Sequence, residues 1–225
     1  MARIHVGASG FSYPEWRGSF YPQDARPPDF LRLYGERLAA VELNATFYRL
    51  PSEEQLQTWA EATPPHFRFA VKAGRAITHG RLDVLATFCE RVNVLGERLG
   101  PLLVELPEDR PRDEGFLRLL LDSLPPTLDA AFELRHPSWT GAEVPVRVND
   151  LESEAPFRYL RLRDHPYDDD ALDRLATRIE LQDVPVYCFF NRGEATDHSP
   201  HGEPTAVTAL RLDAALARAA PRRRQ

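Results

Sequence analysis

Side chains that could do chemistry gather at the ends of the short apolar segments of this chain. Among them we predict a catalytic group made of Glu42, Lys72, Glu133 and His136. Glu42 and Glu133 could form a carboxylate pair that transfers a proton or holds a divalent metal, and His136 could act as a base or as a metal ligand. Structural roles remain the alternatives: the glutamates could pair with arginines, and His136 could be hydrogen-bonded near a proline turn.

Lys72 is distinguished by composition, because the 28 basic residues comprise 27 arginines and this single lysine. This bias suggests that arginine serves wherever a generic positive charge is sufficient. A retained lysine suggests a compact point charge, or an amine that can lose its proton, and a guanidinium provides neither. The alternative is that Lys72 extends along the barrel edge or pairs with Glu42 or Glu105.

The same segment ends and the loops after them supply side chains that could hold a substrate. Arg135 and Arg161, together with Lys72, would bind a phosphate or a carboxylate. Asparagine is a poor strand former, yet three of the four asparagines fall at strand ends, where Asn44 and Asn191 could orient polar groups. The predicted substrate-binding residues are Ser9, Tyr13, Asn44, Tyr48, His79, Arg135, Arg161 and Asn191.

Alternating strands and helices would bring these residues together. Apolar patterning predicts strands over residues 3–6, 39–44, 67–72, 102–106, 130–134, 144–149, 157–162 and 184–190, and helices over 30–38, 52–60, 82–99, 113–124, 170–181 and 205–219. Ser52 and Gln55 form a capping box at the start of one helix. Repeated strand–helix alternation implies parallel strands, and about eight of them suit a small (β/α) barrel. A doubly wound sheet is the second choice, because the glycines after the first strand lack the dinucleotide-binding spacing.

One connection is too short for the repeat. Residues 136–144 leave no room for a crossover helix, which needs about a dozen residues. We therefore expect a shortened TIM-like (β/α) barrel that lacks one outer helix between about Trp139 and Phe157. The barrel should form one domain over residues 1–220, followed by a frayed basic tail at 221–225.

Composition limits the classes of protein. The 225 residues carry a net charge of −6, with 43% apolar and 28% charged residues, which is typical of a globular protein. The chain has no apolar run of roughly 18 residues and no signal-peptide pattern, so we expect a cytoplasmic protein without membrane contact. Cys89 and Cys188 lie in apolar segments and are expected to be buried free thiols.

Longer strings in the chain resemble the YecE-like family, also called domain of unknown function seventy-two. The most specific are Asn44-Ala45-Thr46-Phe47-Tyr48 and Arg135-His136-Pro137-Ser138-Trp139, supported by residues 7–13, 67–72, 159–162 and 190–191. The resemblance implies a TIM-like barrel in a cytoplasmic bacterial protein, and it implies no reaction. The chain departs from the usual family residues at Phe11, Ala45, Glu105, Arg163, Asp164 and Arg192, so its substrate could differ.

Three hypotheses for function follow. The first is a hydrolase or isomerase that acts on a small anionic substrate, for example a phosphorylated one, at the carboxyl-terminal mouth of the barrel. It needs no nucleotide cofactor, and a divalent metal is left open. The second is a nucleic-acid-binding or processing protein, which a net charge of −6 disfavours without excluding a local patch of arginines. The third is a non-catalytic binding or scaffold protein, in which the face without a helix exposes an apolar stripe that recruits a partner protein or pairs two copies as a homodimer.

Overall fold

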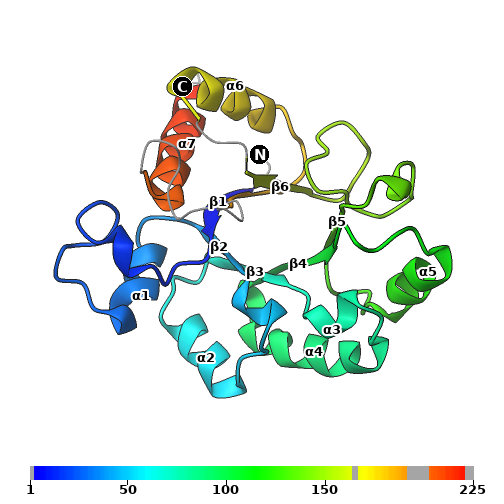
Figure 1. The fold of residues 1–225 in the computed structure, drawn as a ribbon. Coiled ribbons are helices and arrows are strands. Elements are labelled where there is room, and N and C mark those ends of the chain that lie inside the picture. The colour runs from blue at the N-terminus through cyan, green and yellow to red at the C-terminus, as the bar shows by residue number, and fades with distance from the viewer. Residues whose placement is uncertain (1–2, 164–166, 192–202, 221–225) are drawn as a thin grey trace.

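The computed structural model of the chain describes residues 3–163, 167–191 and 203–220. Their parallel strands form one sheet that curls into a nearly closed barrel, in the order β5-β4-β3-β2-β1-β7-β6 (Figure 1). The strands are β1 (Ile4–Ser9), β2 (Ala40–Leu43), β3 (Arg68–Lys72), β4 (Leu99–Leu106), β5 (Ala130–Leu134), β6 (Arg158–Leu162) and β7 (Val186–Phe190). The TIM-like architecture expected from the sequence is confirmed.

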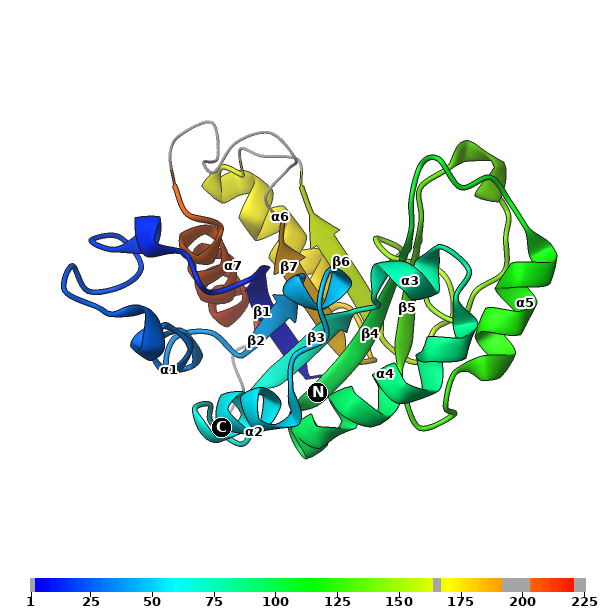
Figure 2. The same ribbon diagram turned by 60° about the horizontal axis from the view of Figure 1, so that its bottom comes forward.

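Helices lie around the outside of the strands, as Figure 2 shows from the side. They are α1 (Phe30–Gly35), α2 (Glu53–Glu61), α3 (Arg75–Thr78), α4 (Leu85–Val92), α5 (Glu114–Ser123), α6 (Asp169–Glu180) and α7 (Thr205–Ala219). The predicted cap of α2 is confirmed, because the Ser52 hydroxyl accepts a hydrogen bond from the Gln55 backbone N–H. No helix of the described residues is long and apolar enough to cross a membrane.

The single helix predicted over residues 82–99 is wrong. A 3₁₀ turn at Leu82–Val84 leads into α4, a second 3₁₀ segment covers Asn93–Arg98, and β4 begins at Leu99. Gly96 has a φ of 56°, which an α-helix cannot accommodate. Leu95 is buried in the same core as α4, so the apolar spacing continues across the break and conceals it.

The seam between β5 and β6 is closed by an extended segment in place of a strand. Residues 144–149, predicted as a strand, make only an isolated bridge, in which the Phe132 N–H donates to the Val146 carbonyl and the Val148 N–H donates to the Phe132 carbonyl. The Asn149 backbone N–H then donates to the Tyr159 carbonyl of β6. The described structure therefore has seven strands rather than eight.

Asn149 explains why the segment crosses the seam at this point. Its φ is 63°, a left-handed conformation that asparagine tolerates better than most residues. Its side-chain amide donates to the Arg161 carbonyl at 3.1 Å and accepts from the Arg161 backbone N–H at 2.8 Å. The amide side chain thus takes the place of a neighbouring strand and holds the end of β6.

The missing outer helix is confirmed, because only the 3₁₀ turn Pro137–Trp139 lies between β5 and β6. The loop that replaces it buries its own apolar side chains, among them Val146, Leu151 and Phe157. The exposed large hydrophobic residues of the described chain are Tyr48, Leu119 and Leu181. These three residues lie outside the loop, and the homodimer predicted for this face stays a prediction.

Two apolar cores follow from the period-two alternation of the strands. Outward-facing side chains pack against the helices, and inward-facing ones fill the barrel. The inner core consists of Ala40, Ala70, Leu103, Ala131, Val146, Val148, Phe157, Tyr159, Tyr187 and Phe189. Cys89 and Cys188 are buried and free, as expected. The predicted tail at 221–225 lies outside the described residues.

His5 makes the fold sensitive to acid at the amino-terminal end of the barrel. Its ring stacks on Tyr187 at 4.8 Å, and its Nδ1 has no hydrogen-bond partner among the described residues. Burial, followed by the charge of Arg68, lowers the pKa of His5 to about 4. An unfolded chain takes up this proton near pH 6.5, so the free energy of unfolding falls as the pH drops from that value towards 4.

We therefore expect the protein to lose about 2 kcal/mol of stability between about pH 7 and about pH 5 through this residue. The variant His5→Phe keeps a ring against Tyr187 and cannot titrate, so its free energy of unfolding should change much less. Urea unfolding of both proteins at the two pH values measures the difference. An equal pH dependence in the variant would contradict the role of His5.

Candidate functional site

A layer of polar and charged side chains lies directly above the inner core, at the carboxyl-terminal end of the barrel. Each member of this layer follows an inward-facing residue by two positions, so strand alternation turns it towards the same axis. Six examples, each with the residue below it, are Glu42 above Ala40, Lys72 above Ala70, Glu105 above Leu103, Glu133 above Ala131, Arg161 above Tyr159, and Asn191 above Phe189. Strands distant in the sequence therefore bring their charged ends into one layer.

Arg161 is the centre of this layer and is almost completely buried. Its Nε lies 2.9 Å from Glu42 Oε2, and its Nη1 contacts both Glu105 and Glu133. Burial would lower the pKa of Arg161, but the three carboxylates outweigh it and raise the pKa above the ordinary value. A permanently charged guanidinium thus holds the ends of β2, β4, β5 and β6 together.

Glu42 is fully buried and uses both of its carboxylate oxygens within the protein. The Ser9 hydroxyl donates to Oε1 at 2.6 Å, and the Tyr159 hydroxyl donates to Oε2 at 2.8 Å. Burial, and then Glu42, raise the pKa of Tyr159 well above its usual value, so the phenol remains a donor. Glu42 is therefore a buried acceptor that positions Arg161.

Glu105 and Glu133 lie side by side on β4 and β5 and are partly open to solvent. Burial would raise the pKa of Glu105, but Arg161 and Lys72 outweigh it and hold this pKa below the ordinary value. Burial acts in the same direction on Glu133, and Arg163 and Arg161 outweigh it. Both carboxylates are therefore ionised at neutral pH.

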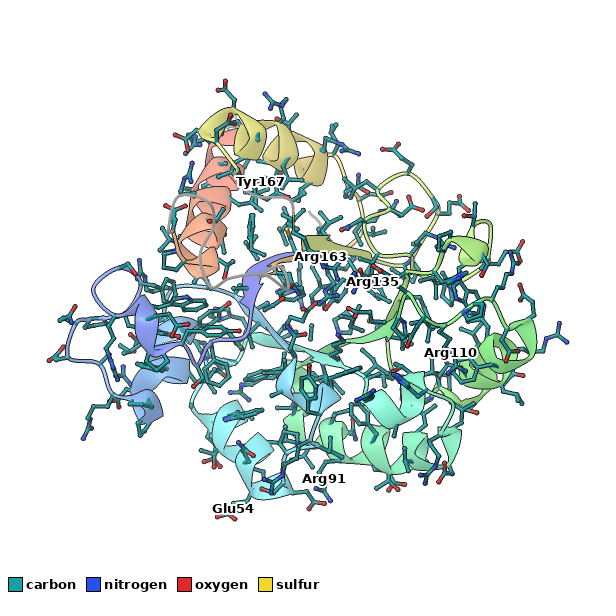
Figure 3. The ribbon with its side chains drawn as sticks, in the orientation of Figure 1. Glu54, Arg91, Arg110, Arg135, Arg163 and Tyr167 are labelled. Carbon is teal, nitrogen blue, oxygen red and sulfur yellow. The ribbon has the colours of Figure 1, made fainter. Side chains whose placement is uncertain are left out.

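Three cations surround these two carboxylates on the solvent side. Lys72 Nζ lies 3.1 Å from Glu105 Oε1, and Arg163 Nη2 donates to Glu133 Oε2 at 2.8 Å. Arg135 Nη1 lies 3.9 Å from Glu105 Oε1, and its Nη2 contacts the exposed Glu108 at 2.6 Å. Figure 3 labels Arg163 and Arg135 near the centre of the ring of strands. We call Lys72, Arg135 and Arg163 the cationic rim.

Lys72 is held in place by the loop after β2. Its Nζ lies 4.5 Å from the centroid of the Phe47 ring, a favourable cation–π distance. The Thr46 hydroxyl donates to the Lys72 carbonyl at 2.7 Å and fixes the end of β3. The lysine side chain is 12% exposed, so part of it remains open to solvent.

The predicted carboxylate pair does converge, but a guanidinium separates its two members. Glu42 and Glu133 both contact Arg161, which occupies oxygens that a metal ion would need. Among residues 3–163, 167–191 and 203–220, no group of three or more His, Cys, Asp or Glu side chains is placed to hold a metal. The donor set of this layer fits arginine pairing rather than metal coordination.

His136 lies in the loop after β5 and caps the 3₁₀ turn at Pro137–Trp139. Its Nδ1 accepts the Ser138 backbone N–H at 3.1 Å and lies 2.7 Å from the Ser138 hydroxyl. Because Nδ1 accepts, the neutral ring carries its proton on Nε2. The catalytic role given to His136 stays a prediction.

The other predicted binding residues are distributed around the mouth. Ser9 and the buried Asn191 belong to the charged layer, and the Tyr13 hydroxyl donates to the Ser9 carbonyl at 2.9 Å. Tyr48 is 83% exposed, and the exposed His79 lies 2.9 Å from the Arg75 carbonyl through Nδ1. Asn44 lines a separate pocket described below. Their binding roles stay predictions.

Three residues were absent from the predicted site, namely Glu105 and Arg163 of the layer and Tyr159 directly below Arg161. The signal that identifies them is the alternation along β4 and β6, because Glu105 follows an inward-facing leucine and Tyr159 and Arg163 flank Arg161 by two residues. Glu105 and Arg163 are also two of the departures from the usual family residues, and they contact each other at 3.4 Å. The two departures therefore place opposite charges together.

Comparison with known proteins agrees with the fold. The family model described as "Protein of unknown function DUF72" matches residues 5–154. The UPF0759 protein YecE of Escherichia coli (strain K12) is 31% identical over 142 residues, covering 60% of this chain and 50% of YecE. YunF of Bacillus subtilis (strain 168) is 31% identical over 82 residues, covering 36% of this chain and 28% of YunF. The chain spans about half the length of the YecE relative that it matches.

Solved structures of DUF72 family proteins share the architecture. One from Enterococcus faecalis V583 gives a TM-score of 0.75 at 17% identity and covers 95% of both chains. Another, from Thermotoga maritima MSB8, gives a TM-score of 0.72 at 22% identity and covers 96% of this chain and 99% of that one. These likenesses concern the fold alone. With a family model matching well over half of its residues, this chain belongs to the DUF72 family of proteins of unknown function.

Proposed function

We propose that this protein is an enzyme that binds a small anionic substrate, phosphorylated or carboxylated, at the cationic rim of the barrel mouth. The observation that carries the proposal is the position of Lys72, Arg135 and Arg163, which face solvent around two ionised carboxylates. Active sites of (β/α) barrels lie at this end of the strands. The reaction class is hydrolysis or isomerisation.

The charges around the mouth are balanced, which makes it less negative than the rest of the chain. Four cations, Lys72, Arg135, Arg161 and Arg163, meet four carboxylates, namely Glu42, Glu105, Glu133 and the exposed Glu108. The rest of a chain with net charge −6 is negative, so an anionic group is drawn to this mouth rather than to the surface at large. Arginine forks and a lysine point charge suit the oxygens of a phosphate or a carboxylate.

Proton transfer would fall to the partly open carboxylates. Glu105 and Glu133 are ionised at neutral pH, so in the proposed reaction one of them accepts a proton from water or from a carbon next to the anionic group. The same carboxyl group would then return the proton to the leaving group or to the neighbouring carbon, and His136 would donate a hydrogen bond to the substrate from Nε2. Glu42 has no free oxygen and would act through Arg161 as a positioning residue.

A thermal-shift panel tests this proposal. Phosphate, pyrophosphate, sugar phosphates and small carboxylates are added separately to the full chain, because a ligand that binds the folded state raises the midpoint of unfolding. The compounds that protect are then incubated with the protein, and the products are followed by NMR. A single-stranded oligonucleotide is included to test the competing nucleic-acid hypothesis.

We expect one or more small anions to protect the chain at low salt and one of the protecting esters to be converted. Stronger protection by the oligonucleotide, with affinity that falls steeply as salt rises, would favour a nucleic-acid-binding protein instead. Absence of protection by every small anion would overturn the proposal. The proposal places the reaction in the cytoplasm, which suits the two free thiols.

A further inference from the structure

A second cavity lies beside the mouth and differs from it in chemistry. It has a volume of about 550 Å³ and opens between the loop after β1, the end of β2, and helices α1 and α2, which Figure 1 labels. This volume lies within the usual range for sites of small organic ligands. None of the members of the cationic rim lines it.

The walls of this cavity are aromatic and apolar. Phe11 and Trp59 pack edge to face at 5.9 Å, and Tyr13, Pro28 and Leu31 continue the lining. No lining residue carries a charge, although 28% of the chain is charged. Charged ligands would find no counter-ion there, whereas a flat ring would contact aromatic faces and edges.

One polar side chain of the cavity could orient a bound ligand. Asn44 lines it, and Asn44 Oδ1 is buried without a hydrogen-bond partner among the described residues. Such an atom lacks the hydrogen bond that water gives it in the unfolded chain, and a bound donor could supply one. The terminal torsion of asparagine is soft, so a small turn of the amide would bring the oxygen to the cavity.

We propose that this cavity binds an uncharged, flat heterocycle that carries an N–H donor beside a carbonyl, as in a lactam. The ring lies between Phe11, Tyr13 and Trp59, the N–H donates to Asn44 Oδ1, and the carbonyl accepts from Asn44 Nδ2. The inference does not depend on the reaction proposed for the mouth, because no member of the cationic rim and none of the carboxylates it surrounds lines the cavity. It assigns Tyr13 and Asn44, which were predicted to bind substrate, to this second cavity instead.

The probe is 2-quinolone, with N-methyl-2-quinolone as its matched control. Both are flat and uncharged, and only the first has the N–H donor. Binding to the full chain is measured by saturation-transfer NMR and by isothermal titration calorimetry. A fragment of this size reaches roughly millimolar affinity, so both methods are applied in that range.

Two variants locate the probe. Asn44→Leu removes the polar partner at similar volume, and Thr58→Trp fills the cavity from an exposed position of α2 without removing a wall. Gln57→Leu on the same helix, outside the lining, is the control for a general effect of an added apolar side chain. Circular dichroism and the unfolding midpoint confirm that each variant is folded.

We expect the wild type and Gln57→Leu to bind 2-quinolone about tenfold more tightly than the N-methyl compound. Asn44→Leu should bind the two probes equally, and Thr58→Trp should bind neither. Equal binding of both probes by the wild type would overturn the inference. So would the absence of any binding, or binding that survives in Thr58→Trp.

Discussion

Replacing Arg161 by methionine is expected to lower the free energy of unfolding by about 3–5 kcal/mol, the largest single effect in this barrel. The variant keeps an apolar stem of similar length but leaves Glu42, Glu105 and Glu133 without their shared cation. The energetic cost is largest at Glu42, because this carboxylate is fully buried and has no access to water. Chemical denaturation at neutral pH measures the loss.

Arg163→Met is the matched control. Arg163 contacts Glu105 and Glu133 from the same end of β6, but its side chain is 29% exposed, so its removal should cost about 1 kcal/mol or less. The double variant Glu42→Gln with Arg161→Met should cost less than the two single losses together, because it removes a charge with its partner. Similar losses in Arg161→Met and Arg163→Met would contradict the central position of Arg161.

Acid should reduce the difference in free energy of unfolding between the wild type and Arg161→Met. The pKa values of Glu105 and Glu133 are held below their ordinary values in the folded wild type, so the stability they contribute is present above about pH 4.5 and is lost as the pH falls through the folded values. In the variant the part of this contribution that Arg161 supplies is gone, and Lys72 and Arg163 retain the rest. The difference in free energy of unfolding is therefore largest near neutrality and shrinks in acid.

Lys72→Met is expected to weaken binding of inorganic phosphate about ten- to a hundredfold, which is the usual loss for one hydrogen bond assisted by charge. The effect on stability should be small. Methionine keeps an apolar contact with Phe47, and Glu105 retains Arg161 as a partner. Isothermal titration calorimetry at low salt gives both affinities.

A change of net charge alone would also weaken binding of an anion, and Arg91→Met controls for it. Arg91 pairs with Glu53 away from the strand ends, and Figure 3 shows it at the periphery. Its removal changes the net charge by the same amount as removal of Lys72 and should leave the affinity within about twofold. Equal losses in both variants would mean that phosphate responds to the overall charge and not to the rim.

Much of the fold could be predicted from the sequence, because each core strand is a short apolar run with a polar or charged residue at or beside its end. The absent helix after Trp139 followed from chain length alone. The closure between β5 and β6 could not be predicted, because it depends on the side-chain amide and the left-handed backbone of Asn149. Neither feature produces a periodic pattern in the sequence. The break at Gly96 was concealed for a related reason, since burial of Leu95 continues across it.

Most residues of the charged layer could be predicted from the sequence, but the ion pairs between them could not. Strand alternation brings Glu42, Lys72, Glu133 and Arg161 to one end, as expected. The pairing of each carboxylate with a cation depends on strand order and on the depth of the side chain in the barrel. Arg161 lies deep enough to contact three carboxylates. The loop residues His79, His136 and Tyr48 obey no such alternation, so their positions had to come from the structure.

The most direct test of the cationic rim is a crystal of the full chain soaked in selenate, a tetrahedral dianion whose anomalous scattering locates it without ambiguity. The account predicts a selenate peak within hydrogen-bond distance of Lys72 Nζ and the Arg163 guanidinium at the barrel mouth. The peak should be absent from crystals of Lys72→Met soaked in the same way. Selenate bound only elsewhere on the wild-type protein, or a mouth without a peak, would contradict it.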